Sequence, residues 1–279
     1  MSCREAAGVP AGSPRISVAG EQIAVCREGR GVPVVCLTAI AHGGGDFDAF
    51  AARMKSRFEI IRIDWPGHGR SGDAAAAPSA RRYADLLAEL LPALAVEHPI
   101  LIGNSIGGAA AILHAERHPV RGLVICNAGG LVAVDATVKR FCSIFAGFFA
   151  AGERRAGWFG PAFAAYYRLL VLPSRSAAAQ RRRIIASGYE VAGQLRLAWE
   201  SFGRAEADIR DVAGRLDAPV WVAWSRGDRI IPLGRCRPAI KAMKRAVLTT
   251  FAGGHAPFLE QPDAFAEAFV DFTDALRAA

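Results

Sequence analysis

Short runs of apolar residues alternate along the chain with longer stretches in which apolar positions recur at helical spacing. This alternation is typical of an α/β fold, in which a mostly parallel sheet of eight strands has helices on both faces. The first two runs are separated only by residues 19–21, so we expect a hairpin there. The pattern predicts strands at Arg15–Val18, Gln22–Cys26, Val34–Thr38, Ile60–Asp64, Ile100–Asn104, Gly122–Asn127, Val220–Ser225 and Val247–Phe251, and helices near Ser79–Ala95, Ile106–Arg117 and Asp263–Arg277.

The alternation stops between residues 136 and 205. This stretch has several helix-like patterns and no convincing strand, and it contains the runs FCSIFAGFF and PAFAAYYRLLVL. The strand pattern then resumes at VWVAWS. We therefore expect a core formed by residues 1–135 and 206–279, with residues 136–205 inserted as a helical lid over the carboxyl edge of the sheet.

The length and composition fit one elaborated domain. The chain has 279 residues, of which 52% are hydrophobic and 22% charged, and this suffices for a large core. No segment approaches the roughly 20 apolar residues of a membrane span, and the first 14 residues lack the apolar centre of a signal peptide. We expect a cytoplasmic protein that has no membrane partner.

Cysteine usage gives no sign of a metal site. The six cysteines lie far apart and include no Cys-x-x-Cys pair, so we expect neither structural zinc nor a disulfide framework. Cys36 and Cys126 lie inside apolar, strand-like runs, where a thiol acts as a small hydrophobic group. None stands at a predicted strand-to-helix turn, where a nucleophile would be expected. The cysteines are Cys3, Cys26, Cys36, Cys126, Cys142 and Cys236.

The positive charge is concentrated in one region. The net charge is +8, and residues 139–215 contain thirteen basic and six acidic residues, an excess of seven. A solvated helical surface explains this excess. The alternative explanation is attraction of an anionic substrate or an acidic partner protein. Nucleic acid is not expected as a partner, because no recognisable binding module accompanies the charge.

The segment Gly103-Asn104-Ser105-Ile106-Gly107 fits the pattern G-x-S-x-G between a predicted strand and a predicted helix. A sharp turn there forces the serine into an unfavourable backbone conformation, and only glycines two residues away avoid collisions with the adjoining chain. Ser105 would also stand at a helix N-terminus, which favours developing negative charge. The segment predicts that Ser105 is a nucleophile.

A serine nucleophile needs a base, and the base needs an acid that orients it. His255 follows the last predicted strand in FAGGHAPF, and Asp228 follows the preceding strand in VWVAWSRGD, so both belong at the carboxyl edge of the sheet. The order Ser105, Asp228, His255 is the one expected for this turn. Asp64 also ends a strand, but we expect it to brace a loop.

The chain resembles the α/β-hydrolase superfamily over nearly its whole length. The resemblance implies a serine hydrolase without metal or organic cofactor, whose commonest substrates are small carboxylic esters. HAPF and the arginine-bearing lid resemble enzymes that hydrolyse methyl esters on acyl chains held by an acidic acyl carrier protein. The resemblance is carried by LTAIAHGGGDF (Leu37–Phe47), IDWPGHGRSG (Ile63–Gly72), GNSIGG (Gly103–Gly108), WSRGDRIIP (Trp224–Pro232) and GGHAPFLEQP (Gly253–Pro262).

The resemblance also implies an oxyanion hole made from two backbone N–H groups. The amide of Ile106, directly after the nucleophile, is one donor. Related enzymes have His-Gly after the first parallel strand, where this chain has Thr-Ala; this register makes Ile40 the second donor, and we favour it. Taking the segment 42–45, HGGG, as the motif would make Gly43 or Gly44 the donor instead. We expect His42, Gly43 and Asn104 at the pocket.

Three functions are compatible with these residues. The first is hydrolysis of a carboxylic ester or thioester through an acyl-enzyme, with an anionic or carrier-linked acyl substrate. The second is hydrolysis of a carbon–carbon bond in dienone acids, whose enzymes resemble this chain at GNSIGG but place a tryptophan where Ala256 stands. The third is a ligand-binding protein that kept the fold without catalysis, although such proteins often lose a member of the triad.

Overall fold

The computed structural model describes residues 5–278, so Cys3 lies outside the described part of the chain. An eight-stranded sheet has the order β1-β2-β4-β3-β5-β6-β7-β8. β1 and β2 form the predicted hairpin, β2 also runs antiparallel to β4, and the other neighbours are parallel, which confirms the predicted fold class. The strands are β1 (Arg15–Val18), β2 (Glu21–Gly29), β3 (Val32–Leu37), β4 (Phe58–Ile63), β5 (Ile100–Asn104), β6 (Gly122–Cys126), β7 (Val220–Ser225) and β8 (Ala246–Phe251).

The central strands β5, β6 and β7 are buried over their whole length. Each is therefore a nearly continuous apolar run, as expected for parallel strands covered on both faces. The largest difference from the predicted boundaries is at β2, which continues three residues beyond Cys26 because Val25 to Gly29 pair with β4. Pairing with a strand far away in the chain sets the end of β2, so the local pattern of apolar residues could not predict it.

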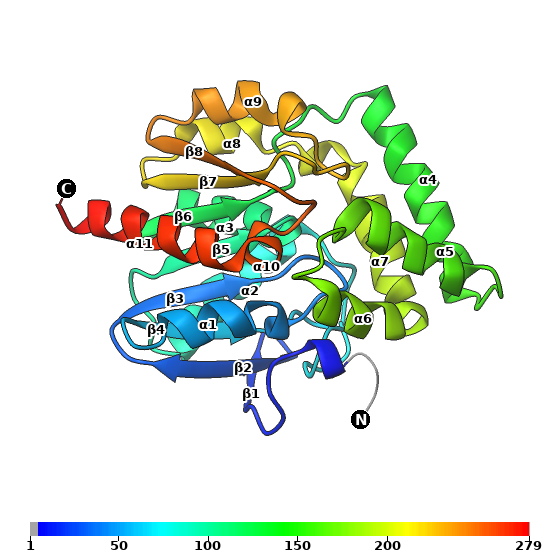
Figure 1. Ribbon diagram of the computed structural model, residues 1–279, viewed down its shortest axis with the longest axis horizontal. Helices are drawn as coiled ribbons and strands as arrows, with labels where there is room; N and C mark the ends of the chain where they lie inside the picture. The colour runs from blue at the N-terminus through cyan, green and yellow to red at the C-terminus, as the bar shows by residue number, and fades with distance from the viewer. Residues whose placement is uncertain (1–4, 279) are drawn as a thin grey trace.

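Helices cover both faces of the sheet (Figure 1). α1 and α11 lie on one face, where Arg53 forms an ion pair with Asp263, and α2 and α3 lie together on the other. The pattern did not predict α1, because seven residues are too few to show a helical period. The helices outside the insertion described next are η1 (Glu5–Ala7), η2 (Gly44–Phe47), α1 (Asp48–Met54), α2 (Ala80–Ala93), α3 (Ile106–Arg117), η4 (Ala205–Ala207), α8 (Arg210–Arg215), α9 (Leu233–Ala242), α10 (Pro257–Glu260) and α11 (Pro262–Ala278).

A group of helices lies between β6 and β7 in the chain and contains no strand in the described residues. Figure 1 shows this group at one end of the sheet rather than on either face. Among the described residues, no helix is both long and apolar enough to cross a membrane. The group, called the inserted helices from here on, consists of α4 (Ala136–Glu153), α5 (Phe159–Tyr166), the π-helical η3 (Tyr167–Val171), α6 (Ala178–Ala186) and α7 (Gly188–Phe202).

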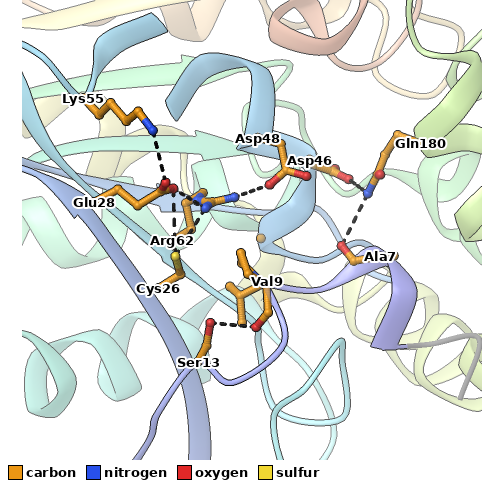
Figure 2. A network of polar contacts seen from close by, with 12 residues as sticks. Ala7, Val9, Ser13, Cys26, Glu28, Asp46, Asp48, Lys55, Arg62 and Gln180 are labelled. Carbon is orange, nitrogen blue, oxygen red and sulfur yellow. Dashed lines mark hydrogen bonds and ion pairs between the residues drawn. The ribbon is translucent and has the colours of Figure 1, made fainter. Parts of the chain in front are cut away.

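A charge network around the buried side chain of Arg62 holds β4 against its neighbours (Figure 2). The Arg62 side chain on β4 is 2% exposed and forms ion pairs with Glu28 on β2 and Asp48 on α1. Lys55 Nζ lies 3.8 Å from the same Glu28 carboxylate. A guanidinium is tolerated inside a protein when such partners surround it. The network fixes the start of α1 and with it the loop of residues 38–47, which leads into that helix.

Candidate active site

Ser105 stands at the sharp turn between β5 and α3, with backbone angles φ 56° and ψ −118°. A positive φ is costly for a residue with a side chain, so the surrounding structure must impose it. The neighbouring backbone comes so close to the turn that only glycine fits at the two positions flanking it, Gly103 and Gly107. A Cβ at Gly103 would lie 2.4 Å from the carbonyl oxygen of Gly107, and a Cβ at Gly107 would lie 2.5 Å from that of Leu37. The turn leaves 7% of Ser105 exposed at the N-terminus of α3.

His255 and Asp228 meet at the carboxyl ends of β8 and β7. The Nδ1 atom of His255 lies 2.9 Å from Oδ2 of Asp228, and the two side chains are 6% and 0% exposed. The other carboxylate oxygen accepts hydrogen bonds from the backbone N–H groups of Ile230 and Ile231, at 2.8 and 3.1 Å. A carboxylate bound in this way holds the Nδ1–H tautomer of the imidazole and leaves Nε2 free to exchange a proton.

Two buried asparagines position this pair, and the sequence alone did not reveal either role. Asn127, directly after β6, donates from Nδ2 to Asp228 Oδ2 at 2.5 Å and accepts from the Ser225 N–H at 3.1 Å. Asn104 donates to the carbonyl oxygen of His255 at 2.9 Å. The available signal was positional, since both asparagines end predicted strands at the edge where the catalytic groups were expected.

The loop that carries His255 is also tied to the inserted helices. The His255 N–H donates to the carbonyl oxygen of Val171, at the end of η3, at 2.7 Å. Glu260 accepts from the Gly254 N–H at 2.6 Å and from the backbone N–H of Ser174 at 3.1 Å. The position of the imidazole therefore depends on the segment that connects η3 with α6.

A cavity of about 480 Å³ brings the predicted residues together. Ser105 and His255 both line it, as do Ile40 and Ile106. A volume of this size accommodates a small organic molecule. The inserted helices add an apolar and aromatic wall that includes Phe141, Cys142, Tyr166, Tyr167, Leu195 and Trp199.

The loop after β3 carries the three amides considered for the second oxyanion donor, those of Ile40, Gly43 and Gly44. Among the described residues, neither the Ile40 N–H nor the Ile106 N–H has a hydrogen-bond partner, and both residues line the cavity. The Gly44 N–H instead donates to Oδ1 of Asp64 at 2.7 Å. An amide already bound to a buried carboxylate is not free to bind an oxyanion, which argues against Gly44 as the donor.

Gly43 and Asn104, which we expected at the pocket, are not among the residues that line this cavity. Gly43 is packed against the N-terminal segment so closely that a Cβ there would lie 2.6 Å from the carbonyl oxygen of Ala7. Asp64 braces the same segment by accepting from the Val9 N–H at 3.0 Å. The glycine run thus lets two backbones approach closely, whereas Asn104 is turned toward the backbone that carries His255.

His42, the third residue that we expected at the pocket, is among the residues that line this cavity. Its Nδ1 atom lies 2.5 Å from Oδ2 of Asp46, so the cavity borders a second buried imidazole–carboxylate pair. The sequence placed His42 at the pocket but gave no role to Asp46. The spacing of four residues was visible, but it became a contact only because a 3₁₀ turn follows the loop.

Two other reactive side chains in the cavity are kept neutral. Burial raises the pKa of the Cys142 thiol to about 11, so this cysteine is a poor nucleophile near neutral pH. Burial, and next the nearby carboxylate of Asp228, raise the pKa of the Tyr166 phenol. Neither group is therefore an anionic nucleophile near neutral pH.

Comparison with known proteins identifies the family of this chain. The model of the alpha/beta hydrolase family matches residues 35–268, which is well over half of the chain. The chain belongs to the alpha/beta hydrolase family. The matched range includes the serine turn, the segment of the inserted helices and the loop that carries His255.

The relatives of this alpha/beta hydrolase include a named esterase and an uncharacterized protein. The pimeloyl-acyl-carrier-protein methyl ester esterase of Xanthomonas campestris pv. campestris is 30% identical over 261 residues, which cover 89% of this chain and 97% of the relative. An uncharacterized protein of Mycobacterium tuberculosis is 27% identical over 278 residues, which cover 88% of this chain and 77% of the relative.

Solved structures of esterases share the fold. An esterase from Exiguobacterium antarcticum superposes with a TM-score of 0.79 at 18% identity, covering 94% of this chain and 99% of the other. A thermophilic esterase from Thermogutta terrifontis gives a TM-score of 0.77 at 19% identity, with coverage of 95% and 97%. At such identities the likeness establishes the architecture. Together with the family match and the relatives, it makes this alpha/beta hydrolase an esterase-like enzyme.

Proposed function

We propose that this hydrolase cleaves a carboxylic ester, or a thioester, through a covalent acyl-enzyme. One observation carries the proposal: the strained Ser105 and the Asp228-bound His255 line the same cavity. Ser105 Oγ attacks the substrate carbonyl while His255 Nε2 takes the hydroxyl proton and then passes it to the leaving group. Asp228 keeps the imidazole in the required tautomer and stabilises the imidazolium that forms.

The tetrahedral oxygen would be bound by the N–H groups of Ile106 and Ile40. Both residues line the cavity, and the N-terminus of α3 adds a favourable dipole on the side of Ser105. A water molecule activated by His255 then attacks the acyl-enzyme, and the proton returns to Ser105 as the acid leaves. Every step uses groups of this chain and water.

We also propose that residues 136–205 act as a cap over a core of residues 1–135 and 206–279. The inserted helices supply Phe141 and Trp199 to the cavity wall and bind the loop of His255 through Val171. A cap of this kind excludes water from the reacting groups, which strengthens the electrostatic interactions between them. Residence in the cytoplasm stays a prediction from the sequence.

The cavity rim supports an anionic substrate, including an acyl chain held by an acidic carrier protein. Four exposed arginines line the cavity. Among the described residues, the lining contains one exposed carboxylate, that of Glu206. The charge of the arginines would raise the local concentration of an anionic ester and speed its association. The related Xanthomonas esterase acts on a carrier-protein methyl ester by its name. The arginines are Arg81, Arg204, Arg229 and Arg235.

Turnover of a panel of esters and thioesters by the wild-type protein and by Ser105→Ala tests this function. We expect the substitution to lower kcat/KM by on the order of 10⁵-fold or more, with the melting temperature unchanged or slightly raised, because removal of the hydroxyl leaves the fold intact. Anionic esters should be preferred over neutral esters of equal length at low salt. A folded Ser105→Ala protein that keeps the activity would contradict the proposal.

A further inference from the structure

The proposed mechanism leaves one buried titratable pair in the cavity unused. His42 and Asp46 are 2% and 0% exposed, and their side chains meet at 2.5 Å between Nδ1 and Oδ2. The ring of His42 also packs against Tyr167, with 5.8 Å between the ring centroids. The imidazole is therefore held on two sides, by a carboxylate and by an aromatic ring.

A chain of hydrogen bonds fixes the orientation of this pair. Gln180 on α6 donates from Nε2 to Asp46 Oδ1 at 2.6 Å, a contact visible in Figure 2. The amide oxygen of Gln180 accepts from Nη1 of Arg183 at 3.2 Å. Because a guanidinium donates and never accepts, this contact assigns the oxygen and the nitrogen of the amide. Asp46 therefore accepts from both sides, and His42 Nδ1 carries the proton that it donates.

The other ring nitrogen of His42 is left for a ligand. Among the described residues, Nε2 has no hydrogen-bond partner, and the ring lines the cavity that contains Ser105. The ring of Tyr167 packs against His42, and the same cavity wall includes apolar side chains such as Val171. A polar atom in such a place is costly unless something in the cavity binds it.

We propose that His42 and Asp46 form a subsite for an oxygen-bearing group of the substrate, a hydroxyl or a carboxylate, separate from the ester that is cleaved. This inference rests on the proposed ester hydrolysis and specifies part of its substrate. A neutral imidazole accepts at Nε2 from a hydroxyl, and a protonated one donates to a carboxylate oxygen. Asp46 holds the opposite nitrogen in both cases. His42 thus determines specificity rather than carrying out the bond cleavage.

The test uses 4-nitrophenyl esters of acyl chains from four to eight carbons that end in a methyl, a hydroxyl or a carboxylate group. At the chain length that reaches His42, we expect kcat/KM of the wild-type enzyme for one polar ester to exceed that for the methyl-ended ester about tenfold, as expected for one added hydrogen bond. The hydroxyl and carboxylate arms identify which oxygen group is bound.

Two variants of His42 and one control variant test whether the preference for polar esters depends on Nε2 of His42. His42→Asn keeps a donor near the position of Nδ1 and so retains a partner for Asp46, but removes the group that faces the cavity; it should abolish the preference. His42→Gln places an amide near the position of Nε2 and should restore part of it. His98→Asn changes an exposed histidine before β5 and is the matched control, with no change expected.

A binding measurement shows whether the subsite proposal fails independently of the proposed ester hydrolysis. Calorimetry on Ser105→Ala protein with the free acids of the same series needs no turnover, and it should show the same preference as the kinetics. A preference in binding without hydrolysis of any ester would keep the subsite and overturn the proposed function. Hydrolysis with equal rates for all three chain ends, or a preference that His42→Asn leaves unchanged, would overturn the subsite.

Discussion

Two imidazole–carboxylate pairs border one cavity, and they share much of their chemistry. In each, Nδ1 of a buried histidine faces Oδ2 of an aspartate, at 2.9 Å for His255–Asp228 and 2.5 Å for His42–Asp46. In each, a side-chain amide also donates to the carboxylate, from Asn127 at 2.5 Å in the first pair and from Gln180 at 2.6 Å in the second.

The pairs differ in how they are held. Asp228 also accepts from two backbone N–H groups after β7, and the His255 backbone is fixed by Asn104 and by Val171. Asp46 accepts from side chains alone among the described residues, and one of them belongs to α6 of the inserted helices. Rigid backbone anchoring suits a base that must meet a nucleophile in one geometry. A side-chain link to α6 suits a group that responds to what fills the cavity.

Replacing each aspartate by asparagine should separate the pairs most strongly. Asp228→Asn is expected to lower kcat by about 10⁴-fold, because it favours the wrong tautomer of the catalytic imidazole. Asp46→Asn is expected to lower kcat/KM by about tenfold or less, and mainly for polar esters, since it weakens one substrate contact. Steady-state kinetics on methyl-ended and polar esters measures both. Equal losses for the two variants would contradict the assignment of roles.

His114 is also buried, but no carboxylate binds it among the described residues, so its contribution to stability should depend on pH differently from that of the two pairs. Burial, and next the charge of His118, lower the pKa of His114 to about 4. Since the unfolded side chain titrates near pH 6.5, the unfolded state binds more protons between these values, and acid lowers the free energy of unfolding. The loss should reach about 3 kcal/mol by pH 4.

Urea unfolding of the wild type and of His114→Leu from pH 7.5 to 4 measures this loss. The stability of the leucine variant should fall less steeply with acid, whereas His98→Asn, which changes an exposed histidine, should follow the wild type. Parallel curves for the wild type and His114→Leu would show that the folded protein does not hold His114 neutral.

The smallest effect concerns the link between Asp46 and α6. Gln180→Leu removes a donor to a buried carboxylate and should lower the free energy of unfolding by about 1.5 kcal/mol. Gln194→Leu, on α7, is the matched control because the amide oxygen of Gln194 is buried without a partner among residues 5–278, so its replacement should cost less. Chemical unfolding of both variants gives the comparison. A cost for Gln194→Leu as large as that for Gln180→Leu would argue against a special role for the link.

Much of the fold could be predicted from the sequence because its signals are local. The central strands are continuous apolar runs, and the turn at Ser105 needs glycines at two fixed positions, where the structure shows backbone too close for a Cβ. The order of strands in a doubly covered sheet then placed Asp228 and His255 at the same edge. These inferences required no knowledge of side-chain contacts.

The features that could not be predicted from the sequence depend on packing between residues far apart in the chain. Asn127 and Glu260 bind residues about 100 and 86 positions away in the chain, and nothing near them in sequence indicates their partners. Gly43 looked like a pocket residue because a glycine run beside a histidine suits a binding loop. Its real neighbour is the segment around Ala7, and no pattern in the chain connects the two.

The central claim is that Ser105 is an activated nucleophile in the cavity shared with His255. Mass spectrometry of the intact protein after reaction with a fluorophosphonate probe, followed by peptide mapping, tests it most directly. We expect one adduct, on Ser105 of the wild-type protein, and none on Ser105→Ala. A folded wild-type protein that gains no adduct, or an adduct that maps to another residue, would contradict the account.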